Sequence, residues 1–232
     1  MAKSGYKVID SDMHVMEPPD LWERYIDPQY RSQAPRGANE YFMDLRLSHE
    51  GRIIARQDQS KTGFFGDEIT KETKRSEEFG RLGIFKGFHE RGWDGQTQLE
   101  AMDAEGIDLA LIFPSLGLFA HAKVYDDDQL ASAISRAYND WLFEFCQSDN
   151  TRMHGAGMIP AQNVDAAVQE IRRVKEELGF KAVFLRPNPI RGRNWHDPVY
   201  DPMWKECEKQ GLAVCFHEGI PCELPVAMAE RF

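Results

Sequence analysis

The sequence lacks the features of a membrane or secreted protein. No stretch approaches the roughly 18 consecutive apolar residues of a membrane-spanning helix, and residues 1–12 (MAKSGYKVIDSD) lack the apolar centre of a signal peptide. The four cysteines form no CxxC pair and no zinc-finger spacing; they are Cys146, Cys207, Cys215 and Cys222. We therefore expect a cytoplasmic protein whose cysteines are reduced thiols used for packing.

Basic residues are also scarce. The chain of 232 residues has 28 Lys and Arg against 38 Asp and Glu, a formal net charge of −10, and no sustained basic stripe. Nucleic acids and anionic membranes both require a basic surface, so neither is an expected partner. A hydrophobic fraction of 42% is ordinary for a globular protein. We expect one domain that spans residues 1–232.

Short apolar runs alternate with amphipathic stretches, most clearly in the second half of the sequence. This is the pattern of βαβ units around a parallel sheet. Three of the runs stop at a proline, which cannot continue a ladder in a central strand. The predicted strands cover residues 7–12, 109–114, 155–160, 182–187 and 213–218.

Helices are predicted between these strands. Thr97 and Glu100 have the spacing of a capping box that opens one helix. Asp201 followed by Pro202 is a favourable N-cap and first turn for another. Two longer helices each have an apolar face, formed by Leu130, Ile134, Tyr138, Trp141 and Phe145 in the first and by Val164, Val168, Ile171, Val174 and Leu178 in the second. Glycines mark the predicted ends of three of the helices: Gly106, Gly179 and Gly211.

Residues 27–95 do not follow this rhythm. The segment is polar and contains glycine, and residues 41–46 and 52–56 are predicted to pair as a short hairpin. We interpret 27–95 as an insertion after the first strand that covers one end of the barrel. Its charged run at 71–78 is interpreted as a solvated face or a mobile loop rather than as a subunit contact.

Consecutive βα units of this kind predict a TIM-like (β/α)8 barrel. A complete barrel has eight units, and at roughly 30 residues for each unit the sequence contains about five of them. The predicted barrel is therefore incomplete. The alternative fold is an open, doubly wound sheet of five strands.

Asp12 and His14 occupy alternate positions where the first predicted strand ends, in the motif DSDMH (10–14). Residues two apart in a strand share a face, and active sites in α/β barrels form at the carboxyl ends of the strands. A carboxylate and an imidazole that converge there suit a divalent metal ion such as zinc or manganese. The alternative is a solvated strand end with an incidental histidine.

His217 lies at the end of the last predicted strand, whose Val214 and Phe216 are expected to face the helices. A histidine at the end of an apolar strand requires a polar partner, because a buried polar group without one is unfavourable. The alternative is a hydrogen bond to a neighbouring loop. Two such strand ends in one chain favour a metal site with Asp12, His14 and His217 as ligands.

Arg186 ends the fourth predicted strand and is our candidate for binding a substrate carboxylate, for which a guanidinium fork is suited. The alternative is a salt bridge to a neighbouring loop. Asn188 follows on the same loop as a weaker candidate. Glu17 and Trp22 come after the first-strand motif and are candidates for the mouth of the site, although packing is the favoured role of Trp22.

Five segments of the chain resemble the amidohydrolase-related family, above all its branch similar to aminocarboxymuconate-semialdehyde decarboxylase. They are IDSDMHVMEPPDLWERYI (9–26), GIDLALIFP (106–114), YNDWLFEFC (138–146), GAGMIP (155–160) and AVCFHEG (213–219). The resemblance implies that the DxH motif supplies two metal ligands, Asp12 and His14, and that His217 supplies another. It also implies a catalytic histidine and a metal-binding aspartate later in the barrel, which we expect beyond Phe232.

The same resemblance implies a metal-dependent enzyme with one divalent ion, zinc in the first place and manganese in the second. The expected activity is non-oxidative decarboxylation of a small aromatic or unsaturated carboxylic acid. The alternatives are a metal-dependent hydrolase of an amide, lactone or ester, and a catalytically inactive, barrel-like binding protein. A homodimer or higher homo-oligomer is also expected on this basis.

Overall fold

The structure is a computed structural model that describes residues 5–18, 20–37, 47–49, 52–53, 91–115, 117–120 and 126–217. Its main element is a five-stranded sheet in the order β1-β5-β6-β7-β8, in which every pairing is parallel. The strands are β1 (Ile9–Val15), β5 (Leu109–Pro114), β6 (Met153–Met158), β7 (Ala182–Leu185) and β8 (Ala213–Phe216). All five predicted strands are present.

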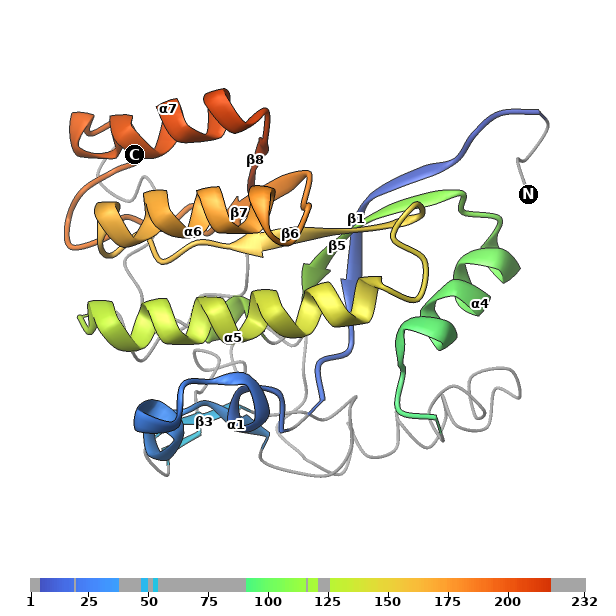
Figure 1. Cartoon of the computed structure of the whole chain (residues 1–232), viewed down its shortest axis with the longest axis horizontal. Coiled ribbons are helices and arrows are strands. Elements are labelled where there is room, and N and C mark those ends of the chain that lie inside the picture. The colour runs from blue at the N-terminus through green and yellow to red at the C-terminus, as the bar shows by residue number, and fades with distance from the viewer. Residues whose placement is uncertain are drawn as a thin grey trace, which may run out of the picture.

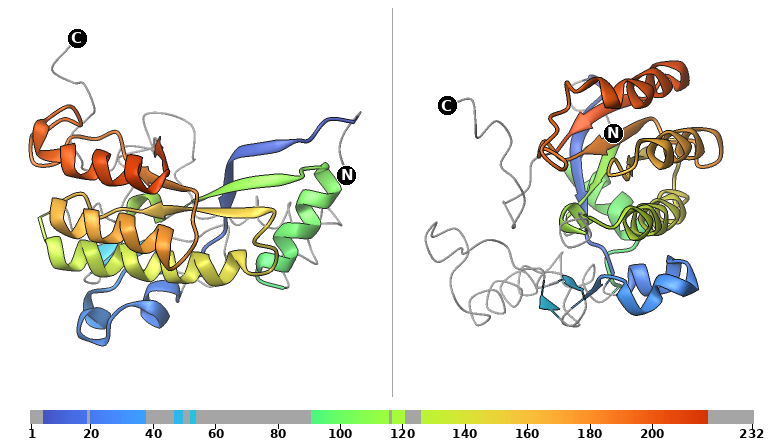
Figure 2. Two further views of the ribbon diagram at one scale, coloured as in Figure 1. Left: turned by 45° about the horizontal axis from the view of Figure 1, so that its top comes forward. Right: turned by 90° about the vertical axis from the view of Figure 1, so that its left-hand side faces the viewer.

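Strand order and helix placement decide between the two predicted folds. Successive strands are neighbours throughout the sheet, and the helices α5 (Asp128–Cys146), α6 (Val164–Glu176) and α7 (Asp201–Gln210) lie side by side on one face of it (Figures 1 and 2). A doubly wound sheet reverses its strand order and carries helices on both faces. The curled sheet is therefore an incomplete (β/α) barrel, as predicted, and the open doubly wound alternative is wrong.

Four of the five strands differ from their predicted bounds. β7 and β8 end at Leu185 and Phe216, each two residues earlier than predicted. β1 continues to Val15, where the prediction ends at residue 12, so Asp12 and His14 lie within the strand. β6 begins at Met153 and ends at Met158, two residues earlier than predicted. In β1 the residues beyond the predicted end include the polar His14 on the face turned away from the helices, where an apolar run gives no signal.

The sheet and the helices pack closely at β6. A Cβ atom added to Gly155 would lie 2.8 Å from side-chain atoms of both Leu142 and Phe180. Glycine therefore lets α5 approach the strand. The apolar face predicted for α5 is confirmed, since Leu130, Ile134, Tyr138, Trp141 and Phe145 are all buried.

Two predicted helix caps are wrong. Helix α4 (Gly95–Glu105) begins after Asp94, whose Oδ1 accepts hydrogen bonds from the backbone N and the Oγ1 of Thr97. Thr97 is therefore inside the first turn of the helix. The N-cap is Asp94, because its carboxylate accepts from the backbone amide of Thr97. In α7 the N-cap is Tyr200, and Asp201 is the first helical residue.

A smaller group of elements covers the part of the chain that follows β1. It contains α1 (Leu21–Tyr25), the 3-10 helix η1 (Pro28–Gln33) and a sheet of β2 (Arg36–Gly37), β3 (Leu47–His49) and β4 (Arg52–Ile53). β3 and β4 pair antiparallel, so a hairpin forms here, with 47–49 as its described first strand. The predicted strand at 41–46 and the charged run at 71–78 lie outside the described residues.

Trp22 packs as predicted: it is fully buried and its Nε1 donates to the Ile134 carbonyl.

The described cysteines agree with the predicted packing role. Cys146, Cys207 and Cys215 are free thiols. Burial raises the pKa of the Cys146 thiol to about 12 and, together with the nearby Glu206 carboxylate, that of the Cys207 thiol to about 11. Both side chains therefore stay protonated and unreactive at neutral pH. Cys222 lies outside the described residues.

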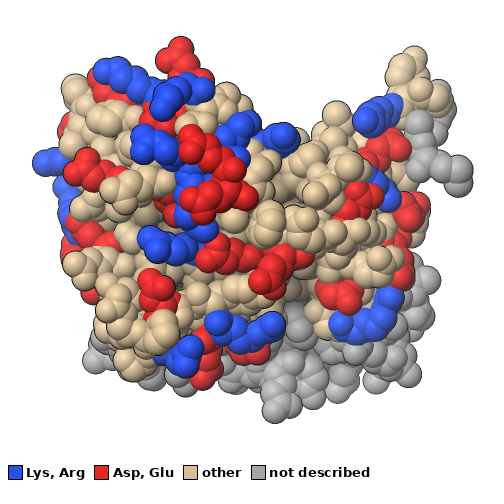
Figure 3. Space-filling model, in the orientation of Figure 1, with Lys and Arg blue, Asp and Glu red and all other residues tan. Residues whose placement is uncertain are grey.

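Charges of both signs cover the helical face. Asp and Glu side chains lie between Lys and Arg side chains across the face shown in Figure 3. Several form ion pairs between neighbouring helices, such as Arg173 with Asp140 and Arg172 with Glu206. Among the described helices, none has the length and apolar character that crossing a bilayer requires.

A buried amide ties α5 to β6 and α6. The Asn139 side chain is fully buried; its Nδ2 donates to the Met158 carbonyl at 2.9 Å and to Glu170 at 2.7 Å, and its Oδ1 accepts from the Met158 N at 2.7 Å. We expect Asn139→Ala to lower the free energy of unfolding by about 2 kcal/mol, because it leaves buried polar groups without partners. Urea denaturation measures this change.

Ser132→Ala is the matched control on the same helix, because the Ser132 hydroxyl only donates back to the Asp128 carbonyl. We expect it to alter stability by less than about 0.5 kcal/mol. Equal effects of the two substitutions would contradict the assigned role of Asn139.

Candidate metal centre

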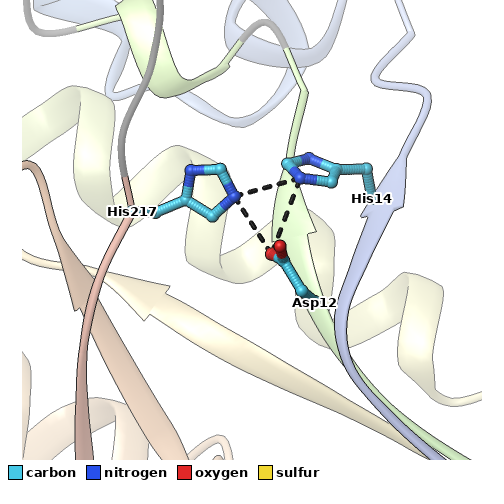
Figure 4. A group of neighbouring side chains, drawn as sticks. All are labelled: Asp12, His14 and His217. Atoms are coloured by element: carbon cyan, nitrogen blue, oxygen red, sulfur yellow. Dashed lines mark hydrogen bonds and ion pairs between the residues drawn. The ribbon is translucent and has the colours of Figure 1, made fainter.

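Asp12 and His14 alternate along β1 with residues that enter the core. Met13 and Val15 are buried against the helices, whereas Asp12 and His14 are exposed on the other, concave face of the sheet. Between Asp10 and Met13 the register with β5 shifts by one residue, which is a β-bulge. Bulges bend a strand and redirect its side chains. The bulge includes Asp12, whose carboxylate points toward His217 (Figure 4).

His217 directly follows β8 and faces these two side chains across the sheet (Figure 4). Its Nε2 lies 3.0 Å from Asp12 Oδ1 and 3.0 Å from His14 Nε2. The third side of the triangle, from His14 Nε2 to Asp12 Oδ1, is 3.7 Å. The sheet thus brings together the three side chains predicted as metal ligands, from positions more than 200 residues apart in the sequence.

Hydrogen bonding fixes the orientation of the His14 ring. Its Nδ1 lies 2.8 Å from the carbonyl oxygen of Pro114, which can only accept. The proton of neutral His14 is therefore on Nδ1, and the lone pair of Nε2 points at His217 and Asp12. Metal-binding histidines are oriented in this way by an acceptor behind the ring.

The donor set fits a divalent ion. With metal–ligand bonds of about 2.0–2.2 Å, two ligand atoms of one ion are about 3.0–3.6 Å apart, close to the distances in this triangle. Imidazole nitrogens with a carboxylate oxygen suit zinc or manganese. The Asp12 side chain is 66% exposed, His14 37% and His217 17%, so further coordination positions are open to water or substrate. Within the described part of the chain, this is the group of histidine, cysteine and acidic side chains that could hold a metal.

A cavity of about 50 Å³, open to solvent, lies at the same end of the sheet. Its walls come from the carboxyl ends of β6 and β7 and from the loops that follow, and include Leu118, Met158, Ile159, Phe184, Ile190 and Trp195. The Phe184 ring is 6.2 Å from the Phe113 ring, which is 5.2 Å from the His217 ring. The aromatic pair therefore connects the cavity with the candidate metal centre.

Both predicted substrate-binding residues line this cavity. Arg186 and Asn188 lie on the loop after β7. Arg186 Nη1 donates to the Leu118 carbonyl at 3.0 Å, and the Arg186 carbonyl accepts from Trp195 Nε1 at 3.0 Å. The guanidinium group is thus held at the cavity wall. Binding of a carboxylate by Arg186 and Asn188 stays a prediction.

Glu17 does not line the mouth of the site as expected. Its side chain is only 1% exposed, and its carboxylate accepts a hydrogen bond from the Gly117 backbone. Sequence reasoning also missed Phe184 and Trp195 as walls of the cavity. Phe184 had a signal, since it shares the inward face of β7 with Arg186. Trp195 had none, because its loop carries no strand or helix period.

A tight turn holds the cavity loop. The backbones of Ile190 and Arg193 bond to each other in both directions, and the residues between them, Arg191 and Gly192, have positive φ values of 51° and 74°. The Arg191 guanidinium forms ion pairs with Asp128 and Asp126. A non-glycine residue in this conformation is unfavourable by roughly 1 kcal/mol, which is also about the upper value of an exposed ion pair.

We therefore expect Arg191→Gly to leave the free energy of unfolding nearly unchanged, because relief of strain offsets the lost ion pairs. Arg191→Ala loses the ion pairs and keeps the strain, so it should be about 1 kcal/mol less stable than Arg191→Gly. Chemical denaturation of the two variants gives the difference. Equal stability of the two variants would show that the positive φ carries no cost.

A curled parallel sheet with polar side chains converging at the carboxyl ends of its strands is the arrangement of a (β/α)-barrel enzyme. The chain belongs to the amidohydrolase family, whose model matches residues 9–232. This result agrees with the resemblance seen in the sequence.

Two curated relatives are decarboxylases. The chain is 28% identical to 2-amino-3-carboxymuconate-6-semialdehyde decarboxylase of Dictyostelium discoideum, over 58% of this chain and 36% of that protein. It is 33% identical to gamma-resorcylate decarboxylase of Rhizobium radiobacter, over 54% of this chain and 39% of that protein. The matched segments thus span less than two-fifths of these relatives.

Solved structures share the fold. An amidohydrolase from Mycobacterium avium subsp. paratuberculosis K-10 has a TM-score of 0.69 at 21% identity, covering 92% of this chain and 59% of that one. The 5-carboxyvanillate decarboxylase of Novosphingobium aromaticivorans, complexed with manganese and a nitrobenzoic acid, has a TM-score of 0.56 at 20% identity, covering 99% and 55%. At these identities the likeness concerns the fold alone.

Proposed function

We propose that this chain forms part of a metal-dependent decarboxylase that acts on a small aromatic or unsaturated carboxylic acid. The observation that carries the proposal is the convergence of two imidazole nitrogens and a carboxylate oxygen, connected through the Phe113 and Phe184 rings to a cavity lined by an arginine. The activities of the two curated relatives support the reaction type.

The described residues have distinct roles in this proposal. Asp12, His14 and His217 hold a divalent ion, which supplies positive charge to polarise a substrate oxygen. Arg186 binds the substrate carboxylate and Asn188 adds a hydrogen bond. The walls formed by Phe184, Trp195 and their neighbours exclude water and strengthen these electrostatic interactions. Cleavage of the carbon–carbon bond leaves an electron pair on the substrate carbon, and a proton from a general acid replaces the departing CO2 there.

The experiment is a product assay on the metal-loaded, full-length protein. Hydroxybenzoic acids, including 2,6-dihydroxybenzoate, are tested for release of CO2, and simple lactones, esters and amides for release of acid. We expect CO2 release that a chelator abolishes and manganese or zinc restores. Acid release without CO2 would instead identify the hydrolase alternative. If neither product forms, both catalytic proposals fail, and an inactive binding protein becomes the better account.

The identity of the ion and the assembly state belong to the same proposal. Both zinc and manganese suit the donor set, and the manganese in the related 5-carboxyvanillate decarboxylase structure favours manganese. Elemental analysis of protein purified without added metal distinguishes the two. We also propose a homodimer or higher homo-oligomer, testable by light scattering, and a cytoplasmic location, which the free thiols support.

A further inference from the structure

Glu17 is an acidic side chain buried two residues beyond the end of β1. It is 1% exposed, and burying a carboxylate is unfavourable by several kcal/mol unless hydrogen bonds compensate. One such bond comes from the backbone N of Gly117, at 2.8 Å to Oε1. The two residues are 100 positions apart in the sequence, so the carboxylate joins the segment after β1 to the segment after β5.

Gly117 is shaped to receive this carboxylate. A Cβ atom at that position would lie 2.8 Å from Glu17 Oε1 and 2.8 Å from the Cβ of Pro114. Real Cβ atoms do not approach other atoms so closely, so any larger residue would displace the carboxylate or the turn. The contact therefore depends on a glycine at 117 as well as on an acid at 17.

The carbonyl groups on either side of Gly117 orient two residues of the candidate site. The Pro114 carbonyl accepts from His14 Nδ1 at 2.8 Å and so directs His14 Nε2 toward Asp12 and His217. The Leu118 carbonyl accepts from Arg186 Nη1 at 3.0 Å and holds the guanidinium at the cavity wall. A single backbone segment thus positions a metal ligand from β1 and the carboxylate-binding arginine after β7.

We infer that Glu17 is a positioning residue of the metal centre: by holding Gly117, its buried carboxylate fixes the carbonyls that orient His14 and Arg186. This inference rests on the proposed metal site. The bond between Glu17 and Gly117 involves none of the three ligand side chains. The inference nevertheless predicts that a change at Glu17 alters the geometry of the bound ion. A carboxylate that only stabilised the fold would leave that geometry unchanged in the folded protein.

The test measures cobalt(II) binding to the metal-free chain, since cobalt reports both affinity and, through its visible absorption spectrum, the ligand geometry. We expect Glu17→Ala to weaken cobalt binding by about 10- to 100-fold, the range found when an outer-shell partner is removed, and to change the spectrum. Glu17→Gln keeps an oxygen that can accept from Gly117, so it should recover most of the affinity and the original spectrum. Gly117→Ala, which leaves Glu17 in place, should reproduce the defect of Glu17→Ala.

Arg152→Ala is the matched control for a general loss of stability. Arg152 bonds Asp103 and the carbonyls of Ile107 and Asp108 at the amino ends of β5 and β6, the opposite end of the sheet. It should lower the melting temperature without changing cobalt affinity or spectrum.

Wild-type cobalt affinity and spectrum in both folded Glu17→Ala and Gly117→Ala would overturn the inference and leave the metal site standing. Absence of cobalt binding by the wild-type chain would overturn the metal site itself, and the inference with it. If Glu17→Ala does not fold, Gly117→Ala and Glu17→Gln decide: affinity and spectrum unaltered in Gly117→Ala contradict the inference.

Discussion

Replacing His217 with alanine is expected to weaken binding of a divalent ion by at least about 100-fold, because removing a ligand costs no less than removing an outer-shell partner. His217 Nε2 is the atom that closes the triangle, at 3.0 Å from both Asp12 and His14. Without it, the remaining two ligands belong to one strand and hold the ion from one side only. Isothermal titration with manganese and zinc measures the affinity, and elemental analysis measures the ion retained after purification.

His14→Ala should give a similar loss, since its Nε2 faces the same point. His154→Ala is the matched control: His154 is the second residue of β6, near the opposite end of the same sheet. We expect His154→Ala to retain the wild-type metal content of about one ion for each chain. Unchanged metal content in both His14→Ala and His217→Ala would remove these histidines from the site, whatever the activity of the variants.

The triangle could be predicted from the sequence because it follows from local rules. Strand alternation puts Asp12 and His14 on one face, and parallel strands bring their carboxyl ends to one side of the sheet. β5 was predicted with its observed bounds, since the apolar run LALIFP ends at a proline that also ends the strand. The predicted end of β1 is too early for a different reason. Its polar residues on the concave face interrupt the apolar signal, whereas its pairing with β5 continues to Val15.

Other features depend on contacts between distant segments. Glu17 was predicted at the mouth of the site, and only the fold shows that it is buried against the Gly117 backbone. Trp195 belongs to the cavity because its loop folds back until its indole donates to the Arg186 carbonyl. At the start of α4, two capping residues compete three positions apart, and the side chain of Asp94 reaches the amide of Thr97. Local pattern does not decide such competitions; the surrounding structure does.

Arg186→Ala is expected to raise the KM for an aromatic carboxylate by about 100-fold, because losing a charge-assisted hydrogen bond in a largely apolar site costs roughly 2–5 kcal/mol. The effect should fall mainly on KM. The negative charge that Arg186 binds disappears as CO2 leaves, so the interaction is stronger with bound substrate than later in the reaction and does little for kcat. Steady-state kinetics of the metal-loaded protein separates the two constants, and Arg186→Lys, which keeps the charge but not the fork, should lie between wild type and alanine.

Arg193→Ala is the matched control, because Arg193 is an exposed arginine on the same loop. It should keep the wild-type KM. Metal content separates a defect in substrate binding from a loss of the ion. Arg186→Ala should retain its ion, whereas His217→Ala should not. A higher KM of fully metal-loaded Arg186→Ala is therefore a defect in substrate binding. A KM for Arg186→Ala within about twofold of wild type would exclude the arginine as the carboxylate-binding residue and leave Asn188 as the remaining predicted contact on that wall.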